Sequence, residues 1–376
     1  MLPDAGILLE TIAARLSDQP PPATTTNEPS SRAGSQSGDG SNALPIREGS
    51  RLATPSPVTP SSNEGQRAIP EPSAPSHAAP TRPVAASPGG FPRPVRDTLE
   101  AQIALARQAL SPGSVDGVMG SQTRAALLAF QRREGISATG TLDEATRARL
   151  SLTTAPLTTH VVTSNDLARL QPLSSTWLGK SRQSALEYET VLELVAEKGR
   201  ASPNLVRRLN PALNWTNLTV GTVIQIPDIT DPAAGAKAAF VVISLAGKTL
   251  QAFDARTNLL AHFPCSIAAR VEKRPVGELR VRALAPNPDY TFNPEVFPES
   301  AEARQIKTKL ILPPGPNNPV GTAWTSLDLP GYGIHGTPQP EQVGRTESHG
   351  CFRLANWNAE YFLKIAWVGM PVYVEP

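Results

Sequence analysis

The sequence of 376 residues has few cysteines, few aromatic side chains and little net charge. Its two cysteines, Cys265 and Cys351, are too few for a disulfide-stapled scaffold, although a single bridge between them stays open. Aromatic residues make up 5% of the chain, against 39 prolines, which favours compact domains diluted by irregular chain over one large core. With a formal net charge of +2 and dispersed basic residues, the chain lacks the basic stripe of a nucleic-acid-binding protein.

Long apolar runs are missing as well. The chain has no stretch of about 18 apolar residues, so we expect no transmembrane helix. The N-terminal residues MLPDAGILLE contain no basic residue, and Asp4 and Glu10 interrupt their apolar run. This start is a poor match to a signal peptide.

Proline, serine, alanine, threonine and glycine dominate residues 17–94, which show neither a helical nor a strand period. We therefore predict a disordered tether over residues 1–94. Such a tether either lets a folded part reach a distant target or is low-complexity filler, and the sequence favours neither interpretation.

Residues 95–152 have the pattern of three short helices separated by glycine turns. The segment resembles the peptidoglycan-binding three-helix domain, a likeness that covers the whole unit and implies peptidoglycan as a partner. A generic helical hairpin is the alternative. The residues that carry the resemblance are the Asp116-Gly117-x-x-Gly120 turn, Thr123, Ala126-Leu127, Phe130-Gln131, Gly135, Thr139-Gly140 and Thr146.

Residues 185–230 indicate a small βααβ unit with two helices and a final alternating strand that ends at Pro227. The unit resembles a degenerate LysM module through Leu205, Leu209-Asn210-Pro211 and residues 221–227. Its expected first strand, residues 185–188, matches the pattern of a β-strand poorly. The resemblance implies glycan binding, and packing against the following domain is an equal alternative.

Residues 236–376 are rich in strand patterns and contain one obvious helix near 357–367, with Asn356 as its expected N-cap. We predict strands at 240–243, 249–253, 259–266, 279–283 and 372–374. They indicate a mainly-β antiparallel sandwich or barrel, so the whole chain is predicted to be a multidomain α+β protein.

Two of the five histidines lie close in sequence to a cysteine, in Ile334-His335-Gly336-Thr337 and Ser348-His349-Gly350-Cys351. A loop of this length can bring Cys351 and His335 together as a thiolate–imidazolium pair, which lowers the pKa of a thiol. Gly350 would let its own N–H and that of Cys351 face one point as an oxyanion hole.

Two other interpretations apply to these residue types. His335, His349 and Cys351 are suitable zinc ligands, but no fourth ligand accompanies them. A lone cysteine is usually a small buried apolar residue, and this is what we expect of Cys265. The remaining histidines, His77, His160 and His262, are expected to be structural or exposed.

The two segments resemble the catalytic signature of the L,D-transpeptidases with a YkuD-type catalytic domain, His-Gly-Thr followed by Ser-His-Gly-Cys-x-Arg-x-x-Asn. Pro275-x-Gly277, residues 287–290 and residues 315–324 also resemble family segments, and the likeness covers 236–376. It departs at Arg274, where threonine is usual.

The resemblance implies site roles residue by residue. Cys351 would be the nucleophile, and His335 the proton acceptor and later donor, oriented by the carbonyl of Gly336. Ser348 and His349 would shape the site, and Arg353 would hold substrate or the catalytic loop. The candidate substrate contacts are Trp324, Tyr332, Thr337 and Asn356, although core or rim packing is an alternative for Trp324 and Tyr332.

The implied donor is a peptidoglycan stem tetrapeptide, attacked at the carbonyl of its third residue with loss of D-Ala. The acceptor would be an amine of a second stem, giving a 3→3 crosslink, or a wall-attached protein. We expect no cofactor or metal, a monomer, and export to the periplasm or wall. The alternatives are an L,D-carboxypeptidase, with water as acceptor, and a non-catalytic wall-anchoring protein.

Overall fold

The computed structural model describes residues 90–376 except 347 and 349. Most of the predicted tether and the candidate site residue His349 therefore lie outside the described residues. The last residues of the predicted tether belong instead to a folded unit, because β1 (Arg93–Pro94) pairs with β2 (Ser151–Leu152). Among the described residues, no helix is long and apolar enough to cross a membrane.

The first folded unit contains the three helices expected from the sequence. Buried glutamines hold the turns between them: Gln102 Nε2 donates to Asp116 Oδ1 at 2.8 Å, and Gln102 Oε1 accepts the N–H of Gly117 at 2.7 Å. Each such bond satisfies a polar group that would otherwise be buried without a partner. The helices are α2 (Thr98–Ala106), α3 (Ser121–Arg133) and α4 (Glu144–Arg149).

The second unit is βααβ, but its first strand is not where the sequence analysis placed it. The strand β3 (Leu157–Val161) pairs antiparallel with β4 (Val223–Pro227), and α7 (Val191–Lys198) and α8 (Pro203–Leu209) lie between them in sequence. The strand is hard to recognise because none of its side chains is fully buried. Two short helices follow it, α5 (Ser164–Ala168) and α6 (Trp177–Lys180).

The segment predicted as the first strand, residues 185–188, is attached to the C-terminal domain instead. Leu186 has no exposed surface, its N–H donates to Pro314 O at 2.8 Å, and its carbonyl accepts the N–H of Asn317 at 2.9 Å. Because these bonds satisfy its backbone, the segment does not need a hairpin partner.

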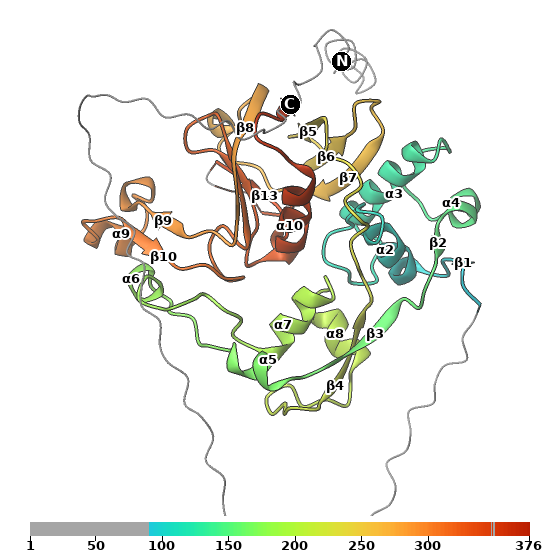
Figure 1. The fold of residues 1–376 in the computed structure, drawn as a ribbon, viewed down its shortest axis with the longest axis horizontal. Coiled ribbons are helices and arrows are strands. Elements are labelled where there is room, and N and C mark those ends of the chain that lie inside the picture. The colour runs from blue at the N-terminus through green and yellow to red at the C-terminus, as the bar shows by residue number, and fades with distance from the viewer. Residues whose placement is uncertain (1–89, 347, 349) are drawn as a thin grey trace, which may run out of the picture. The chain divides into compact units, whose positions relative to one another are not determined.

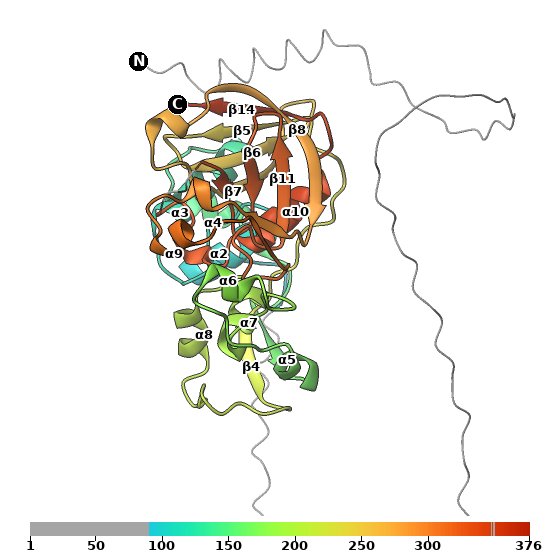
Figure 2. The ribbon, with the colours of Figure 1, turned by 90° about the vertical axis from the view of Figure 1, so that its left-hand side faces the viewer.

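The C-terminal domain is built on one mixed sheet of eight strands in the order β13-β12-β11-β8-β14-β5-β6-β7. Figure 2 shows β14, β5, β6 and β7 side by side in this order. The prediction of a mainly-β domain, a sandwich or barrel, is confirmed in its mostly-β, barrel-like character, but the sheet is not purely antiparallel, because β14 pairs parallel with β5 and β12 pairs parallel with β13. An isolated bridge between Ser266, just after β7, and Arg353 of β13 shows that the sheet curves until its two ends approach each other, which makes it a half-barrel. The strands are β5 (Phe240–Ser244), β6 (Thr249–Phe253), β7 (Leu259–Pro264), β8 (Gly277–Pro286), β11 (Ala323–Leu327), β12 (Gly333–His335), β13 (Phe352–Arg353) and β14 (Pro371–Glu375).

The helix α10 (Asn356–Ile365) packs against β8, β11 and β12 and covers the apolar core (Figure 1). Ala355 is its N-cap, so Asn356 is its first residue and not the predicted cap. The predicted strands of this domain are present, whereas short β11, β12 and β13 were not foreseen. The remaining elements are η1 (Val271–Lys273), β9 (Tyr290–Phe292), η2 (Pro294–Val296), α9 (Ala301–Gln305), β10 (Leu310–Leu312) and η3 (Pro340–Gln342).

The first unit also covers the exposed edge of the sheet at β7. The N–H of Ser111 donates to His262 O at 2.8 Å, and the N–H of His262 donates to Ala109 O at 2.9 Å. Asn358 of α10 donates from Nδ2 to Ser111 Oγ at 3.0 Å. These bonds satisfy backbone groups that an open edge strand would leave unpaired.

We predict that Gly315→Ala destabilises the attachment of the 185–188 segment. Gly315 has φ +140°, and a Cβ there would lie 2.3 Å from Leu186 O, a backbone atom that cannot rotate away. Gly221 is the matched control, since it has φ +89° and no atom within 4 Å of the position that a Cβ would take. Both changes strain the backbone by about 1–3 kcal/mol, but only Gly315→Ala adds the steric conflict. Chemical unfolding and hydrogen exchange at the Leu186 amide measure the difference, and equal losses in both variants contradict it.

Candidate active site

The pairing of β12 with β13 places the principal candidate residues on one face of the sheet. Ile334 lies opposite Phe352 and His335 opposite Arg353 in parallel register. Ile334 and Phe352 are each 1% exposed and point into the core. Because successive side chains along a strand alternate between faces, His335 and Arg353 point to the other face, and Cys351 shares it by its position.

The thiol of Cys351 lies at the start of β12. Its Sγ donates to Gly331 O at 3.4 Å, and a backbone hydrogen bond from Gly333 also reaches it. His335 follows Gly333 by two residues on the same face, a rise of roughly 7 Å along a strand. Cys351 and His335 therefore lie on one face of the sheet near opposite ends of the short strand β12.

The His335 ring is held in one orientation from two sides. Its Nδ1 lies 2.6 Å from Gly336 O, and its ring stacks on Trp324 with centroids 5.5 Å apart. A carbonyl only accepts, so Nδ1 carries the proton and Nε2 keeps a lone pair. The imidazole is thus in the tautomer that can accept a proton at Nε2.

Burial opposes charge on both partners. His335 is 5% exposed, and burial, with a smaller effect from the Arg353 charge, lowers its pKa to about 4. Burial also raises the pKa of the Cys351 thiol, against the opposing effects of Gly333 and Arg353. The resting pair is consequently a neutral thiol and a neutral imidazole, not the thiolate–imidazolium pair expected from the sequence.

The loop before Cys351 differs from the predicted oxyanion hole. Ser348 Oγ donates to Cys351 O at 2.6 Å and accepts the N–H of Gly350 at 3.2 Å. Since the Gly350 N–H is engaged with Ser348, it does not serve as the predicted second donor. A Cβ on Gly350 would meet only Tyr332, at an ordinary 3.8 Å, so no steric need for glycine exists there. Ser348 shapes the loop, as expected.

Asn356 is a support of the site and not a substrate contact. It is 1% exposed, its Oδ1 accepts the N–H of Thr322 at 3.3 Å, and its Nδ2 donates to Pro316 O at 3.2 Å. A Cβ on Gly336 would lie 2.2 Å from Asn356 Oδ1. The amide therefore packs directly against the residue whose carbonyl orients His335.

Thr337 and Tyr332 are also engaged by the protein. Thr337 is 4% exposed and accepts the N–H of Gln339 at 3.3 Å, which removes it from the substrate contacts. Tyr332 is half-buried and donates from its hydroxyl to Lys273 O at 3.0 Å. Trp324 is half-buried and stacks on His335. Trp324 and Tyr332 are therefore the two predicted substrate contacts that keep some exposed surface.

Glu197 of α7 was not found from the sequence. It hydrogen-bonds to Asn356, and burial raises its pKa to about 8 against the opposing effect of that bond. Its neighbour Glu193 accepts from Asn317 Nδ2 at 2.5 Å. No sequence signal indicates these contacts, because both glutamates sit in an ordinary amphipathic helix.

The second cysteine, Cys265, lies in the core and not at the site. Cys265 has no exposed surface, and burial raises the pKa of its thiol, in agreement with a small buried apolar role. Within the part of the chain that the structure describes, which leaves out His349, no three potential metal ligands cluster.

Two family profiles match the chain. One, described as the YkuD L,D-transpeptidase catalytic domain, matches residues 238–374, and the other, described as a peptidoglycan binding domain, matches residues 96–150. This chain carries an L,D-transpeptidase catalytic domain. The half-barrel is the L,D-transpeptidase domain, and the three-helix unit is the peptidoglycan binding domain. The chain is a peptidoglycan L,D-transpeptidase.

Relatives bearing the same name support this assignment. The protein named L,D-transpeptidase YkuD of Bacillus licheniformis is 27% identical over 185 residues, which cover 49% of this chain and 93% of the relative. Its Bacillus subtilis counterpart is 28% identical over 165 residues, covering 44% and 81%. Among solved structures, L,D-transpeptidase 3 of Mycobacterium tuberculosis is 18% identical and covers 43% of this chain and 77% of that one. The TM-score of this match is 0.30.

We predict that stability falls as the pH is lowered from 7 to 5, in part through His335. The folded pKa of about 4 lies below the ordinary 6.5, so the unfolded chain takes up the proton first and folding weakens as pH falls from 6.5 towards 4. His335→Gln, which does not titrate, should remove about 2 kcal/mol of this loss. Urea unfolding at both pH values measures it. His262, whose pKa burial also lowers to about 4, contributes a second loss, and Glu197, whose pKa burial raises to about 8, contributes an opposing gain; His335→Gln leaves both in place. An unchanged pH dependence in His335→Gln contradicts the prediction.

Proposed function

We propose that the chain is a cysteine-dependent L,D-transpeptidase that acts on peptidoglycan stem tetrapeptides through a thioacyl-enzyme. It would form 3→3 crosslinks or attach a protein or amine acceptor. The observation that carries the proposal is the shared face of Cys351 and His335, with His335 Nδ1 fixed on Gly336 O. This arrangement supplies a nucleophile and an oriented base.

The acylation step follows from the neutral resting pair. The Cys351 Sγ attacks the carbonyl carbon of the third stem residue while its proton passes to His335 Nε2. The tetrahedral intermediate collapses as the C–N bond to D-Ala breaks, and the departing amine takes the proton from His335. A thioester on Cys351 remains. Arg353, beside His335 in the register, favours the developing thiolate by its charge.

The deacylation step reverses these roles with a new nucleophile. An acceptor amine loses a proton to His335 Nε2 and attacks the thioester carbonyl, and the Cys351 thiolate leaves and regains the proton. The backbone N–H of Cys351 is the remaining candidate donor to the oxyanion, because that of Gly350 donates to Ser348. The proposed steps need only Cys351, His335, the stem peptide and the acceptor amine.

The modular plan fits a polymeric substrate. The peptidoglycan binding domain would raise the local concentration of the enzyme at the wall, so we propose that it acts in the cell wall or periplasm. The resemblance of the βααβ unit to LysM remains a prediction. Its strands β3 and β4 and helices α7 and α8 are consistent with that plan, and its contacts to the half-barrel favour a supporting role.

We predict that Cys351→Ala abolishes the acyl-enzyme while Cys265→Ala preserves it. Cys265 is the matched control because it is free, has no exposed surface and packs in the core with Ile334 and Phe352. Intact-protein mass spectrometry with a stem tetrapeptide should show the tripeptide adduct in wild type and Cys265→Ala only. An adduct that persists in Cys351→Ala contradicts the nucleophile assignment.

The same experiment with an amine acceptor identifies the second step. Transfer predicts that the adduct disappears faster when amine is added and that a crosslinked product accumulates. Release of free tripeptide at a rate that amine does not change would instead show a hydrolase.

We predict that Gly336→Ala slows acylation by about tenfold or more, because its Cβ would displace the carbonyl that orients His335. The closest atom to that Cβ belongs to Asn356, which offers a direct control. In the Asn356→Ala background the added methyl group has space, so Gly336→Ala should then cost much less. Single-turnover kinetics of the four proteins measure the coupling. Strictly additive losses contradict orientation through Asn356 and Gly336.

A further inference from the structure

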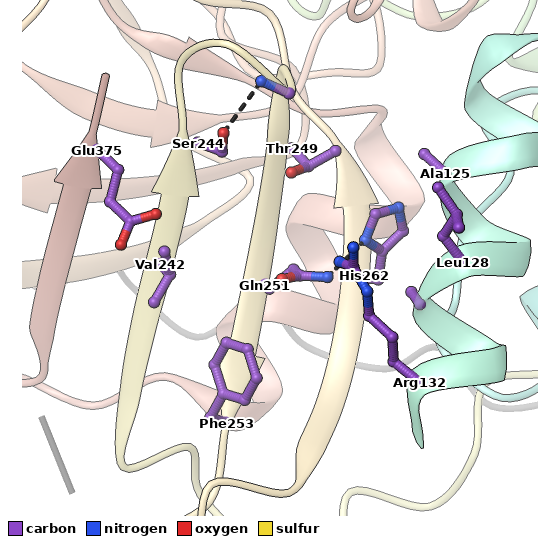
Figure 3. Close-up of a pocket in the computed structure, with 12 residues that line it drawn as sticks. Ala125, Leu128, Arg132, Val242, Ser244, Thr249, Gln251, Phe253, His262 and Glu375 are labelled. Atoms are coloured by element: carbon purple, nitrogen blue, oxygen red, sulfur yellow. Dashed lines mark hydrogen bonds between the residues drawn. The ribbon is translucent and has the colours of Figure 1, made fainter. Parts of the chain in front are cut away.

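A pocket lies between the peptidoglycan binding domain and the half-barrel (Figure 3). Its volume is about 240 Å³, and helix α3 forms one wall while β5, β6, β7 and β14 form the other. The pocket residues alternate with core residues along the strands, as Val242 does with Val241 and Ile243. They therefore face away from the core.

His262 presents an unpartnered polar atom in this pocket. The residue is 2% exposed, and its Nδ1 lies 3.1 Å from Gln251 Nε2. An amide nitrogen only donates, so Nδ1 accepts and Nε2 carries the proton. Within the described residues this Nε2 has no hydrogen-bond partner. A buried donor left without an acceptor is costly, which indicates that a ligand or solvent supplies one.

The charged groups of the pocket lie on opposite sides. In Figure 3 the Arg132 side chain reaches from α3 towards His262, and Glu375 of β14 lies across the pocket. Burial and the Arg132 charge lower the pKa of His262 to about 4, so His262 is a neutral donor at neutral pH. One side thus offers only donors, from Arg132 and His262, and the other offers a carboxylate.

The surface between these groups is small and largely apolar. Val242 and Phe253 line it from the sheet and Leu128 from the helix. The volume of about 240 Å³ is below the range of roughly 300–1,000 Å³ typical of drug-sized ligands. The pocket therefore suits the end of a short peptide better than a glycan segment.

We propose that this pocket binds the carboxyl-terminal end of a short peptide with a small apolar side chain. Its carboxylate would accept from Arg132 and His262 Nε2. The pocket lies on the same face of the sheet as Cys351, but its lining includes neither Cys351 nor His335. It is thus a second site, and it requires both domains.

The test uses the full chain with Cys351→Ala, so binding is measured without turnover. The probe is D-alanyl-D-alanine, a choice that rests on the proposed function, and the comparison ligand is its carboxyl-terminal amide. Calorimetric titration should show binding of the dipeptide and at least about tenfold weaker binding of the amide, because a charge-assisted hydrogen bond is lost.

The variants are Arg132→Gln and His262→Phe, with Arg124→Gln as the matched control on the same helix. Arg124 is exposed and does not line the pocket. We expect each pocket variant to weaken binding by about tenfold or more and Arg124→Gln to leave it unchanged. If His262→Phe fails to fold, the pair of arginine variants decides the outcome.

Three results overturn the proposal: no dipeptide binding, equal binding of acid and amide, or equal binding by Arg132→Gln and Arg124→Gln. The first result means that solvent alone fills the pocket. A further arm sediments the chain with insoluble peptidoglycan. If the dipeptide competes with peptidoglycan for the wild-type chain but not for Arg132→Gln, the natural ligand is a stem end in the wall. If the dipeptide binds but does not compete with peptidoglycan, the natural ligand is a free peptide. Acyl-enzyme formation on Cys351 is measured separately, so the proposed function can fail or hold independently.

Discussion

The short parallel pairing of β12 with β13 is the constraint on which the site depends. Ile334 and Phe352 lie opposite one another, and both side chains are buried in the core, with 1% of each exposed. A slip of one residue would turn these two apolar side chains outward and His335 inward. The packing of the core therefore fixes which side chains face the substrate, and the register, more than any single polar contact, brings the proposed base near the proposed nucleophile.

The carbonyl that orients His335 depends in turn on a contact between domains. Gly336 packs against Asn356, which also hydrogen-bonds to Thr322, to Pro316 and to Glu197 of the βααβ unit. The βααβ unit is thus continuous with the support of the proposed base. Attachment to the wall is not needed to explain why this unit is part of the enzyme.

Sequence reasoning found the elements whose signals are local. The glycine turns of the three-helix unit, the alternating strands β5 and β6, and the pair of His-Gly motifs all lie within short windows and were identified. It failed where the partner is distant in sequence. The strand β3 was missed because its side chains are never fully buried, and Leu186 was misassigned because its partners lie in residues 314–317.

The errors within the site have the same origin. Asn356 and Thr337 are polar residues in a catalytic motif, and a polar residue near a reactive centre is naturally interpreted as a substrate contact. Their burial at 1% and 4% depends on loops that no local pattern describes. The Gly350 N–H was assigned to an oxyanion hole, but the Ser348 hydroxyl, two residues earlier, already accepts it.

Burial also decides how the proposed nucleophile is activated. A resting thiolate–imidazolium pair needs a solvated or strongly charged setting, whereas here burial lowers the pKa of His335 to about 4 and raises that of Cys351. The proton can leave the thiol only as the sulfur begins to bond to carbon, when the negative charge moves onto the carbonyl oxygen. A neutral thiol is also a poor target for oxidants, since the thiolate is the form that reacts. In the proposed mechanism, burial therefore keeps the Cys351 thiol protonated until a substrate carbonyl is in place, and Arg353 and the Gly333 N–H act on the charge that develops during attack.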